Sequence, residues 1–447
     1  MSRPINRLKQ LEGDVRAAVR VIPLIRTGGT IAAIAPGHFR VVGLSRDVRL
    51  GALVGVPQDG RTFIGEVVQV DQDGATIKPF DTHFAAPLGA AALRMPPLTL
   101  SPDASWLGRV VNALGEPIDG GAPLTPGDRL MPTEADPPAP MKRARVRTPL
   151  RTGVRVLDLF TPLCVGQRVG IFAGSGVGKS TLLSMLAHSR SFDVVVVAMV
   201  GERGREVREF LDDALIENRD RSITVVSTSD ESPMMRRLAP KTAMAIAEYF
   251  RDRGQSVLLI VDSITRFAHA ARDVGLAAGE PPVARGYTPS VFGDLPRLLE
   301  RSGPGEEGKG AITGIFAVLV EGDDHSEPIA DTIRGTLDGH IVLERAIADQ
   351  GRYPAVSVLG SVSRLAHHAW APEQRELVSR LRAMIARFED TRDLRLMGGY
   401  QSGRDPELDQ AIALVPRIYD ALRQAPTDPM STDAFRELNI AIKQSRG

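Results

Sequence analysis

Some features are scarce in this sequence, and each scarcity excludes a class of protein. Cys164 is the only cysteine in 447 residues, so neither a disulfide framework nor a cysteine-based metal cluster can form. The longest purely apolar run, Val194–Val200, is far shorter than the roughly 20 residues that a membrane-spanning helix needs. The first residues also lack the apolar centre of a secretory signal peptide. Together these absences predict a cytoplasmic protein.

The features that a nucleic-acid-binding surface needs are scarce as well. The chain has 55 Lys and Arg against 54 Asp and Glu, a net charge of +1, so it has no overall attraction to a polyanion. Aromatic residues make up 5% of the chain, and those of the N-terminal region are not interleaved with Lys and Arg, as a base-stacking surface requires. They are Phe39, Phe63, Phe80 and Phe84. We therefore expect no nucleic-acid partner.

The N-terminal part of the chain divides into a helical segment and a β-rich region. Residues 1–20 place apolar residues at spacings of three and four, opposite a basic face, which predicts a short amphipathic helix. This helix could pack on its own domain, or it could dock on a partner or a membrane surface. Residues 21–95 contain short β-type runs separated by frequent turn signals, the pattern of a small barrel or sandwich.

The central region predicts a nucleotide-binding type of sheet. Residues 96–146 are rich in proline and are expected to form extended connections. From about residue 147, apolar runs alternate with helical patterns, which indicates a parallel sheet covered on both faces. The runs are QRVGIFA, FDVVVVAMVG, SITVVSTS, SVLLIVDS, AITGIFAVLV and GHIVLER. One helix is predicted to begin at Ser232–Pro233 and to end at Gly254. We take this α/β region as residues 96–365.

The C-terminal region is predicted to be entirely helical. After about Ser363 the β-type runs stop, and residues 366–447 are expected to form a small helical domain. One helix should present an apolar face to the rest of the protein. That face consists of Leu377, Leu381, Met384, Ile385 and Phe388.

The sequence AGSGVGKS at Ala173–Ser180 fits a phosphate-binding loop, with alanine in place of its first glycine. It follows a predicted strand and precedes a predicted helix, which is the context that this motif requires. Glycines let backbone N–H groups curl around phosphates, and the helix N-terminus adds a partial positive charge. Lys179 should reach the β- and γ-phosphates of ATP, and the Ser180 hydroxyl should bind Mg²⁺. The expected nucleotide contacts are Ala173, Gly174, Ser175, Gly176, Val177, Gly178, Lys179, Ser180 and Thr181.

Two other predicted strands end in residues suited to phosphate chemistry. Asp262 ends the run SVLLIVDS, where a carboxylate is expected to hold the magnesium. Glu202 and Arg203 end another run. The glutamate could act on an attacking water and the arginine could meet the γ-phosphate; spacing alone equally allows a solvated surface pair.

Seven motifs in order resemble the rotary-ATPase superfamily, and within it the ATPases of type III protein export, the flagellum-specific ATP synthase-like group. They are LGRVVNALGEPIDG, AGSGVGKSTL, VGERGREV, DSITRFA, RGYTPSVFGDLPRLLERSG, EGDDHSEPIADTIRGTLDGHIVLER and GSVSR. The similarity is strong from Trp106 to Arg364. It implies a RecA-like P-loop NTPase core between an N-terminal β-barrel and a C-terminal helical domain.

The resemblance also implies roles for single residues. Glu202 matches the family's catalytic carboxylate. Arg203 and Arg266 match arginines near the γ-phosphate and the subunit interface. Tyr353 matches the aromatic residue that packs on adenine, and Tyr400 is expected to close the other side of that pocket. Arg364, in GSVSR, matches an arginine finger that reaches into the site of the neighbouring subunit.

What the resemblance implies overall is a Mg²⁺-dependent ATP hydrolase that energises protein export, with flagellar export favoured. The family assembles as homohexamers with active sites between subunits. Implied partners are a stator-like regulatory protein at the N-terminus, a central-stalk protein at the C-terminal domain, the export gate, chaperones and export substrates. The implied location is the cytoplasm, in peripheral contact with the inner-membrane export apparatus.

Four alternatives stay open at this stage. Both flagella and injection machines use ATPases with these motifs. A catalytic subunit of an ATP synthase shares the core, although Ser180 stands where such subunits usually carry threonine. A hexameric RNA-translocating helicase shares it too. The fourth alternative is a ring subunit that holds nucleotide without hydrolysing it, and the presence of Glu202 argues against it.

Overall fold

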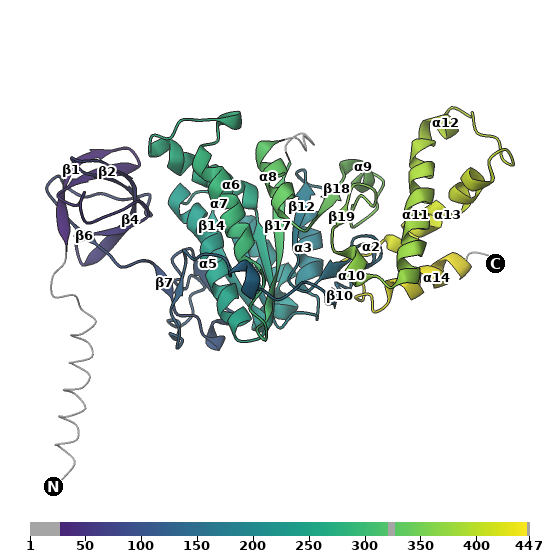
Figure 1. Cartoon of the computed structure of the whole chain (residues 1–447), viewed down its shortest axis with the longest axis horizontal. Coiled ribbons are helices and arrows are strands. Elements are labelled where there is room, and N and C mark those ends of the chain that lie inside the picture. The colour runs from purple at the N-terminus through teal and green to yellow at the C-terminus, as the bar shows by residue number, and fades with distance from the viewer. Residues whose placement is uncertain (1–26, 321–326, 445–447) are drawn as a thin grey trace, which may run out of the picture. The chain divides into compact units, whose positions relative to one another are not determined.

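The computed structural model describes residues 27–320 and 327–444 of the chain, which are coloured in Figure 1. These residues form two compact units. One comprises the residues up to Pro97 together with Ala277–Gly279, and the other comprises Leu98–Leu276 and the residues from Glu280 onward. The predicted amphipathic helix of residues 1–20 lies outside the described residues. The domain boundaries at residues 20, 95 and 365 stay predictions.

The N-terminal unit is a closed six-stranded barrel, which confirms the predicted barrel and excludes the sandwich. The strands pair in the order β1-β2-β5-β4-β3-β6, and closure leaves no unpaired edge. Their bounds are Gly28–Ala35, His38–Val42, Leu53–Gln58, Arg61–Val70, Ala75–Pro79 and Ala91–Arg94 for β1 to β6. Alternate residues of β2 point inward, so that Phe39 and Val41 are buried in the barrel core.

The second unit is built on a nine-stranded sheet, ordered β19-β18-β12-β17-β15-β13-β14-β8, with β16 paired to β17. The strands from β18 to β8 are parallel. The six predicted apolar runs form its six central strands: β12 (Arg168–Ala173), β13 (Val194–Glu202), β14 (Ser222–Thr228), β15 (Ser256–Asp262), β17 (Ala311–Leu319) and β18 (Gly339–Leu343). Every residue of β13 is buried, as expected for a strand with both faces covered.

Three short strands at the sheet's margins carried no clear sequence signal. They are β8 (Val110–Asn112), β16 (Gly303–Pro304) and β19 (Val362–Ser363). Four further short strands lie outside the main sheet: β7 (Thr99–Leu100) pairs with β9 (Met131–Pro132), and β10 (Pro149–Leu150) pairs with β11 (Leu163–Cys164). Each has only two or three residues, too few for a period-two pattern to be recognised.

Helices cover the sheet, as Figure 1 shows. They are α2 (Arg155–Phe160), α3 (Lys179–Ala187), α4 (Gly204–Glu209), α5 (Pro233–Asp252), α6 (Ile264–Ala277), α7 (Pro289–Arg301), α8 (Pro328–Thr336), α9 (Arg345–Ala348) and α10 (Ala366–Ala369). Short helical turns lie at η1 (Ala104–Trp106), η2 (Pro140–Lys142), η3 (Phe210–Ala214), η4 (Ile216–Arg221) and η5 (Ala284–Gly286). The predicted helix start at Ser232 is confirmed, because the Met235 N–H donates to the Ser232 hydroxyl at 3.1 Å.

The proline-rich connection lies against the helices of the second unit. Four ion pairs join it to α5, to the residue after α5 and to α7. Arg129 pairs with Asp252 at 2.8 Å and Arg297 pairs with Asp136 at 2.8 Å; Arg253 pairs with Asp128 at 2.5 Å, and Lys241 pairs with Glu134. This part of the connection is therefore fixed to the core, whereas the sequence predicted only an extended connection.

A buried ion pair beneath this connection gives a stability prediction. The Arg301 and Glu248 side chains are 3% and 5% exposed and lie 2.8 Å apart, and Arg301 also donates to the Thr133 carbonyl at 2.6 Å. Arg301→Met would remove the hydrogen-bonded partner of the buried Glu248 carboxylate and leave it only the more distant Arg251, at 3.9 Å. We expect a loss of about 3 kcal/mol, the lower end of the range for breaking a buried ion pair. We expect calorimetry to show a clearly lower unfolding temperature. Arg297→Met, on the same helix, removes an exposed pair and should cost under about 1 kcal/mol; equal effects of the two variants would contradict the prediction.

The C-terminal helices are α11 (Pro372–Asp390), α12 (Arg392–Leu396), α13 (Pro406–Leu422) and α14 (Ala434–Gln444), and α11 packs along α13 (Figure 1). The buried face of α11 carries Val378, Leu381 and Ile385, at spacings of three and four. Leu377 was predicted on this face but is 43% exposed, because it lies one residue, about 100°, away from Val378. No helix of the described residues is long and apolar enough to cross a membrane.

Candidate active site

The phosphate-binding loop lies at the carboxyl end of β12. The strand ends at Ala173 and α3 begins at Lys179. Gly176 and Gly178 have φ angles of 76° and 94°, in the left-handed region that favours glycine. Because Gly178 is the residue just before α3, the loop delivers the free N–H groups of the helix N-terminus to the same point. The loop can therefore bind phosphate groups as the sequence predicts.

A second segment, residues 344–353, follows β18, includes α9 and contacts this loop. Arg345, the first residue of α9, donates to the Ser175 carbonyl at 2.7 Å. The Tyr353 ring lies next to Gly178, so that a Cβ added to that glycine would be 3.5 Å from two ring carbons. Tyr353 is thus placed beside the loop, where an adenine ring could pack on it. Arg345 ends the motif that contains GHIVLER, but no role was predicted for it.

The carboxylates that end β13 and β15 converge on the loop lysine. Lys179 Nζ is hydrogen-bonded to Asp262 Oδ1 and lies 3.8 Å from Glu202 Oε1. Arg266 Nη2 lies 3.2 Å from Glu202 Oε2. The Glu202 and Asp262 side chains are 6% and 2% exposed. The structure therefore brings together four residues predicted from three separate motifs.

Glu202 is the unusual member of this cluster. Its Oε1 atom is buried and accepts no hydrogen bond among the described residues, which leaves one carboxylate oxygen available to a water or substrate. Burial, and secondarily the negative charge of Asp262, raise the pKa of Glu202 to about 7, against the opposing effect of the Lys179 and Arg266 charges. A carboxyl group that titrates near neutral pH suits general-base chemistry.

The residues of the loop and of β15 fit a magnesium ion. The Ser180 hydroxyl and the Asp262 carboxylate offer oxygen, the donor that Mg²⁺ prefers. No cluster of three or more His, Cys, Asp or Glu side chains that could hold a metal occurs in the described ranges. An ion at this place would therefore depend on phosphate and water oxygens for its other ligands, as is usual for magnesium bound with a nucleotide.

Arg203 and Arg364 do not face this cluster. Arg203 is 76% exposed and pairs with Glu206 at 3.1 Å. Arg364 follows β19, and its backbone N–H donates to the Asp338 carbonyl at 2.9 Å, next to the start of β12. The phosphate-binding loop begins at the other end of β12, roughly 20 Å away at about 3.3 Å per residue. The exposed Arg364 side chain therefore cannot serve the loop of its own chain.

Tyr400 requires a correction, because the structure does not bring it to the adenine side of the site. Its hydroxyl is bonded to Asp409, near the start of α13. The backbone carbonyl of Tyr353 instead accepts a hydrogen bond from the backbone N–H of Gln424, just after the end of α13, at 2.9 Å. The intervening helix separates the two tyrosines by roughly 20 Å, at about 1.5 Å per residue. We leave Tyr400 out of the nucleotide site.

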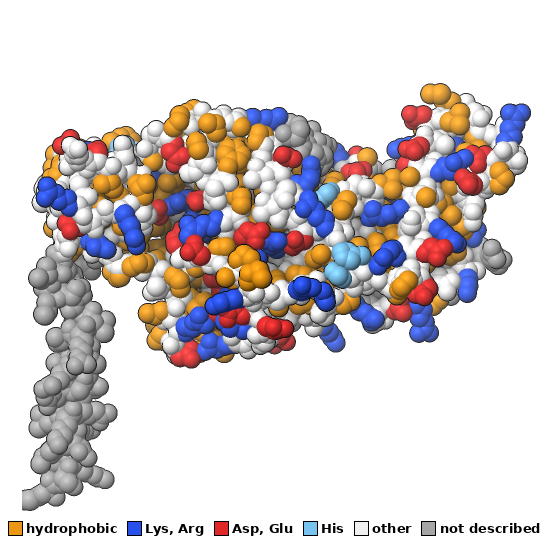
Figure 2. Space-filling view, in the orientation of Figure 1, with side chains coloured by type: hydrophobic (Ala, Val, Ile, Leu, Met, Phe, Trp, Pro, Cys, Tyr) orange, Lys and Arg blue, Asp and Glu red, His pale blue; other side chains and the backbone are white. Residues whose placement is uncertain are grey.

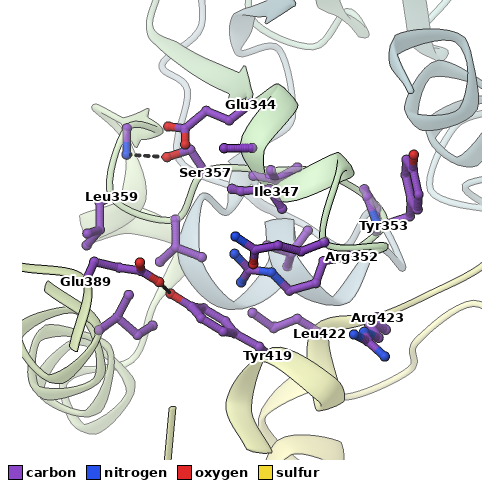
Figure 3. Close-up of a pocket in the computed structure, with 18 of the residues that line it drawn as sticks. Glu344, Ile347, Arg352, Tyr353, Ser357, Leu359, Glu389, Tyr419, Leu422 and Arg423 are labelled. Atoms are coloured by element: carbon purple, nitrogen blue, oxygen red, sulfur yellow. Dashed lines mark hydrogen bonds between the residues drawn. The ribbon is translucent and has the colours of Figure 1, made fainter. Parts of the chain in front are cut away.

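A cavity of about 280 Å³ lies behind Tyr353, between residues 344–360 and helices α11 and α13. Figure 3 shows Arg352 pointing across it to Tyr419, with Tyr353 at its edge. The Arg352 guanidinium lies 3.8 Å from the centre of the Tyr419 ring, and the Tyr419 hydroxyl donates to Glu389 at 2.5 Å. The nucleotide side and the helical domain are thus in direct contact. This contact could not be predicted from the sequence, because the partners are far apart along the chain.

The fold and the site define a P-loop nucleoside triphosphatase. The nucleotide-binding domain of the ATP synthase alpha/beta family matches residues 153–363, and the T3SS EscN ATPase C-terminal domain matches residues 370–439. A flagellum-specific ATP synthase of Agrobacterium fabrum is 56% identical over 416 residues, covering 93% of this chain and 88% of the relative. A type 3 secretion system ATPase of Xanthomonas euvesicatoria is 42% identical, covering 94% and 95%.

The solved structures agree with these relatives. The assembled ATPase EscN of the enteropathogenic E. coli type III secretion system superimposes with a TM-score of 0.86 at 38% identity, over 93% of this chain and all of that one. EscN in complex with its central stalk EscO gives 0.83 at 36% identity. The chain belongs to the family of flagellum-specific ATP synthases and type III secretion system ATPases. It is therefore an ATPase of the type III export family.

Proposed function

We propose that this protein hydrolyses ATP to energise the export of flagellar proteins, in a homohexameric ring whose active sites are completed between neighbouring copies. The observation that carries the proposal is Glu202, a buried carboxylate next to Lys179 and Asp262, one oxygen of which accepts no hydrogen bond among the described residues. A protein that only held nucleotide would not need it. The flagellar assignment is supported by the 56% identity to a flagellum-specific relative, against 42% to a secretion ATPase.

The chemistry assigned to the site is phosphoryl transfer to water. The loop N–H groups and Lys179 would bind the triphosphate, and Tyr353 would pack on the adenine. Glu202 would orient the attacking water and accept its proton. Ser180 and Asp262 would hold Mg²⁺, which neutralises phosphate charge when bound. Arg266, already 3.2 Å from Glu202, would fix the orientation of that carboxylate.

A ring is supported by the position of Arg364. This exposed arginine lies at the end of the sheet opposite to its own loop, so any role at a γ-phosphate must be played in another copy. One chain carries both Glu202 and Arg364 and could therefore build every site of a homohexamer. A relative solved as an assembled ATPase is consistent with this arrangement. Arg203 has a subordinate place near the interface, because it pairs with Glu206 and is exposed.

The part of the helical domain around α12 offers a surface for a central-stalk protein. Leu394, Leu396 and Met397, in and just after α12, are 49%, 76% and 84% exposed, and Figure 2 shows hydrophobic side chains at this end of the molecule. A structural relative is known in complex with its central stalk. The other partners we propose are a stator-like protein at the N-terminus, the export gate, chaperones and exported substrates. The proposed location is cytoplasmic, with peripheral attachment to the inner-membrane export apparatus.

Complementation tests the proposed function directly. In a strain lacking this gene, the wild-type chain should restore swimming and secretion of hook and filament proteins. Lys179→Ala should reduce secretion at least about 100-fold, because the loss of a group that stabilises the transferring phosphate costs several kcal/mol. Lys142→Ala is the matched control, since Lys142 is 70% exposed and remote from the loop in the sequence. If the strain lacking this gene kept normal flagella but lost secretion of needle proteins, that result would instead favour an injection apparatus.

A further inference from the structure

A half-buried arginine on α11 joins three parts of the second unit. Arg382 donates through Nη2 to the Phe160 carbonyl at 2.7 Å and to the Ser361 carbonyl at 3.1 Å. Phe160 ends α2, so its carbonyl carries part of the negative end of that helix. Ser361 is buried and immediately precedes β19. The arginine thus ties the helical domain to the segment that leads to Arg364.

That segment is short and is held by hydrogen bonds, so a displacement of Ser361 should be passed on to the residues that follow it. Ser361 Oγ accepts from the Val342 N–H at 3.0 Å. Two residues later, Ser363 Oγ accepts from Gln167 Nε2 at 3.1 Å, and Gln167 is fully buried. The next residue is Arg364. Arg364 is itself bonded to the Asp338 carbonyl through its N–H and to the Arg334 carbonyl through Nη2. The segment before it is held by the sheet through Gln167 and by α11 through Arg382.

The chemistry of Arg382 indicates that its hydrogen bonds matter more than its volume. Burial lowers the pKa of Arg382. In the described part of the chain no carboxylate opposes that effect, and the buried Nε has no hydrogen-bond partner. Such a group is costly unless its hydrogen bonds compensate. A methionine would fill similar space without that cost. An arginine at this position makes sense where two carbonyls must be held at a fixed place relative to α11.

We propose that Arg382 is a positioning residue for Arg364, so that the orientation of α11 in one copy sets the reach of that arginine into the active site of the next copy. This inference rests on the proposed function, because it assumes that Arg364 acts in the neighbouring site. It connects the helices that would meet a central stalk with hydrolysis one subunit away. The connection runs through one side chain and three backbone residues.

Mixed rings test the inference by separating donor from acceptor. Rings assembled from Lys179→Ala and Arg364→Ala chains should recover MgATP hydrolysis, because the first lends its arginine to the intact loop of the second. Arg382→Met is then added to one partner at a time. In the Lys179→Ala donor it should lower the recovered kcat at least about tenfold with KM unchanged, as expected for a misplaced catalytic group. In the Arg364→Ala acceptor it should change kcat by less than about twofold.

Two further variants keep the result interpretable. Arg380→Met is the matched control on α11, since Arg380 is 75% exposed and, among the residues that the structure describes, pairs only with Glu376. Arg382→Lys keeps the charge. In the Lys179→Ala donor it should restore part of the kcat that Arg382→Met removes. Equal losses from both sides, or no loss from either, would overturn the positioning role. Failure of the two parent chains to recover hydrolysis would instead contradict the trans-acting Arg364 of the proposed function.

Discussion

Glu202→Gln is expected to leave ATP binding nearly unchanged while reducing hydrolysis at least about 1,000-fold. The amide keeps the size of the side chain and one carbonyl oxygen for Arg266, which lies 3.2 Å from Glu202 Oε2. It cannot accept a proton from water. Single-turnover phosphate release and the affinity for a non-hydrolysable ATP analogue would measure the two effects separately.

Glu206→Gln supplies the comparison for this prediction, because Glu206, on α4, pairs with the exposed Arg203 and contacts the site only through a hydrogen bond to Glu202 among the described residues. It should retain hydrolysis within about tenfold, the effect of a residue that acts on the site through another. Near-normal turnover in Glu202→Gln would remove Glu202 from the catalytic role. A loss of nucleotide affinity equal to the loss of kcat would show that the carboxylate only holds the site together.

The same carboxylate predicts the pH dependence of the wild-type enzyme. Burial and the Asp262 charge raise the pKa of Glu202 to about 7. Below that pH the carboxyl group of the free enzyme is protonated and cannot act as a base, so kcat/KM should rise as the pH increases through 7 and level off above it. The residual activity of Glu202→Gln should lack this step. A wild-type profile flat between pH 6 and 8 would contradict the assignment.

The sequence predicts the central sheet and the places of the proposed catalytic residues because their signals are local. Each strand is a continuous apolar run. Glu202 and Asp262 each end a strand, and Lys179 follows the loop after β12, so that parallel strands bring all three to one edge of the sheet. Six correct strands and one glycine-rich loop therefore fix most of the site. The strand order is the additional fact that the structure supplies: β15 and β17 separate β13 from β12.

The residues that the sequence does not reveal are those that act through distant partners. Arg345 bonds to Ser175 and Arg352 packs on Tyr419, and each pair is far apart along the chain. Arg382 lies within an ordinary amphipathic helix pattern, in which an arginine beside the apolar face looks like a solvated charge. Tyr400 shows the opposite case: a motif suggested a role, but the length of α13 places the residue elsewhere.

These long-range contacts connect the α/β region to the helical domain in two places. One passes from Tyr353 through Arg352 to Tyr419 and Glu389, on the side of the chain's own loop (Figure 3). The other passes from α11 through Arg382 to Arg364, on the side that would face a neighbour. Under the proposed function, a movement of the helices would therefore affect two sites: the nucleotide site of the same copy and the site of the neighbouring copy that Arg364 is proposed to enter.

Arg364→Ala is expected to give rings that assemble and bind ATP but hydrolyse it at least about 1,000-fold more slowly, the usual effect of losing an arginine finger. The reason is geometric: Arg364 leaves β19 at the end of the sheet away from its own loop, so the role proposed for its charge at a γ-phosphate requires a neighbouring copy. Sedimentation would measure assembly, and phosphate release would measure kcat on the same sample.

Arg375→Ala is the matched control, because Arg375 is also an exposed arginine that follows Arg364 closely in the chain, and it bonds only to the His367 carbonyl, at 3.0 Å. Its loss should change kcat by less than about threefold, as for an ordinary surface group. Arg364→Lys should remain well below wild type, since a lysine reaches a phosphate as a single point charge and lacks the planar fork of arginine. Full activity in a dilute, monomeric wild-type chain would contradict the shared site, because no second copy would then be present to supply Arg364.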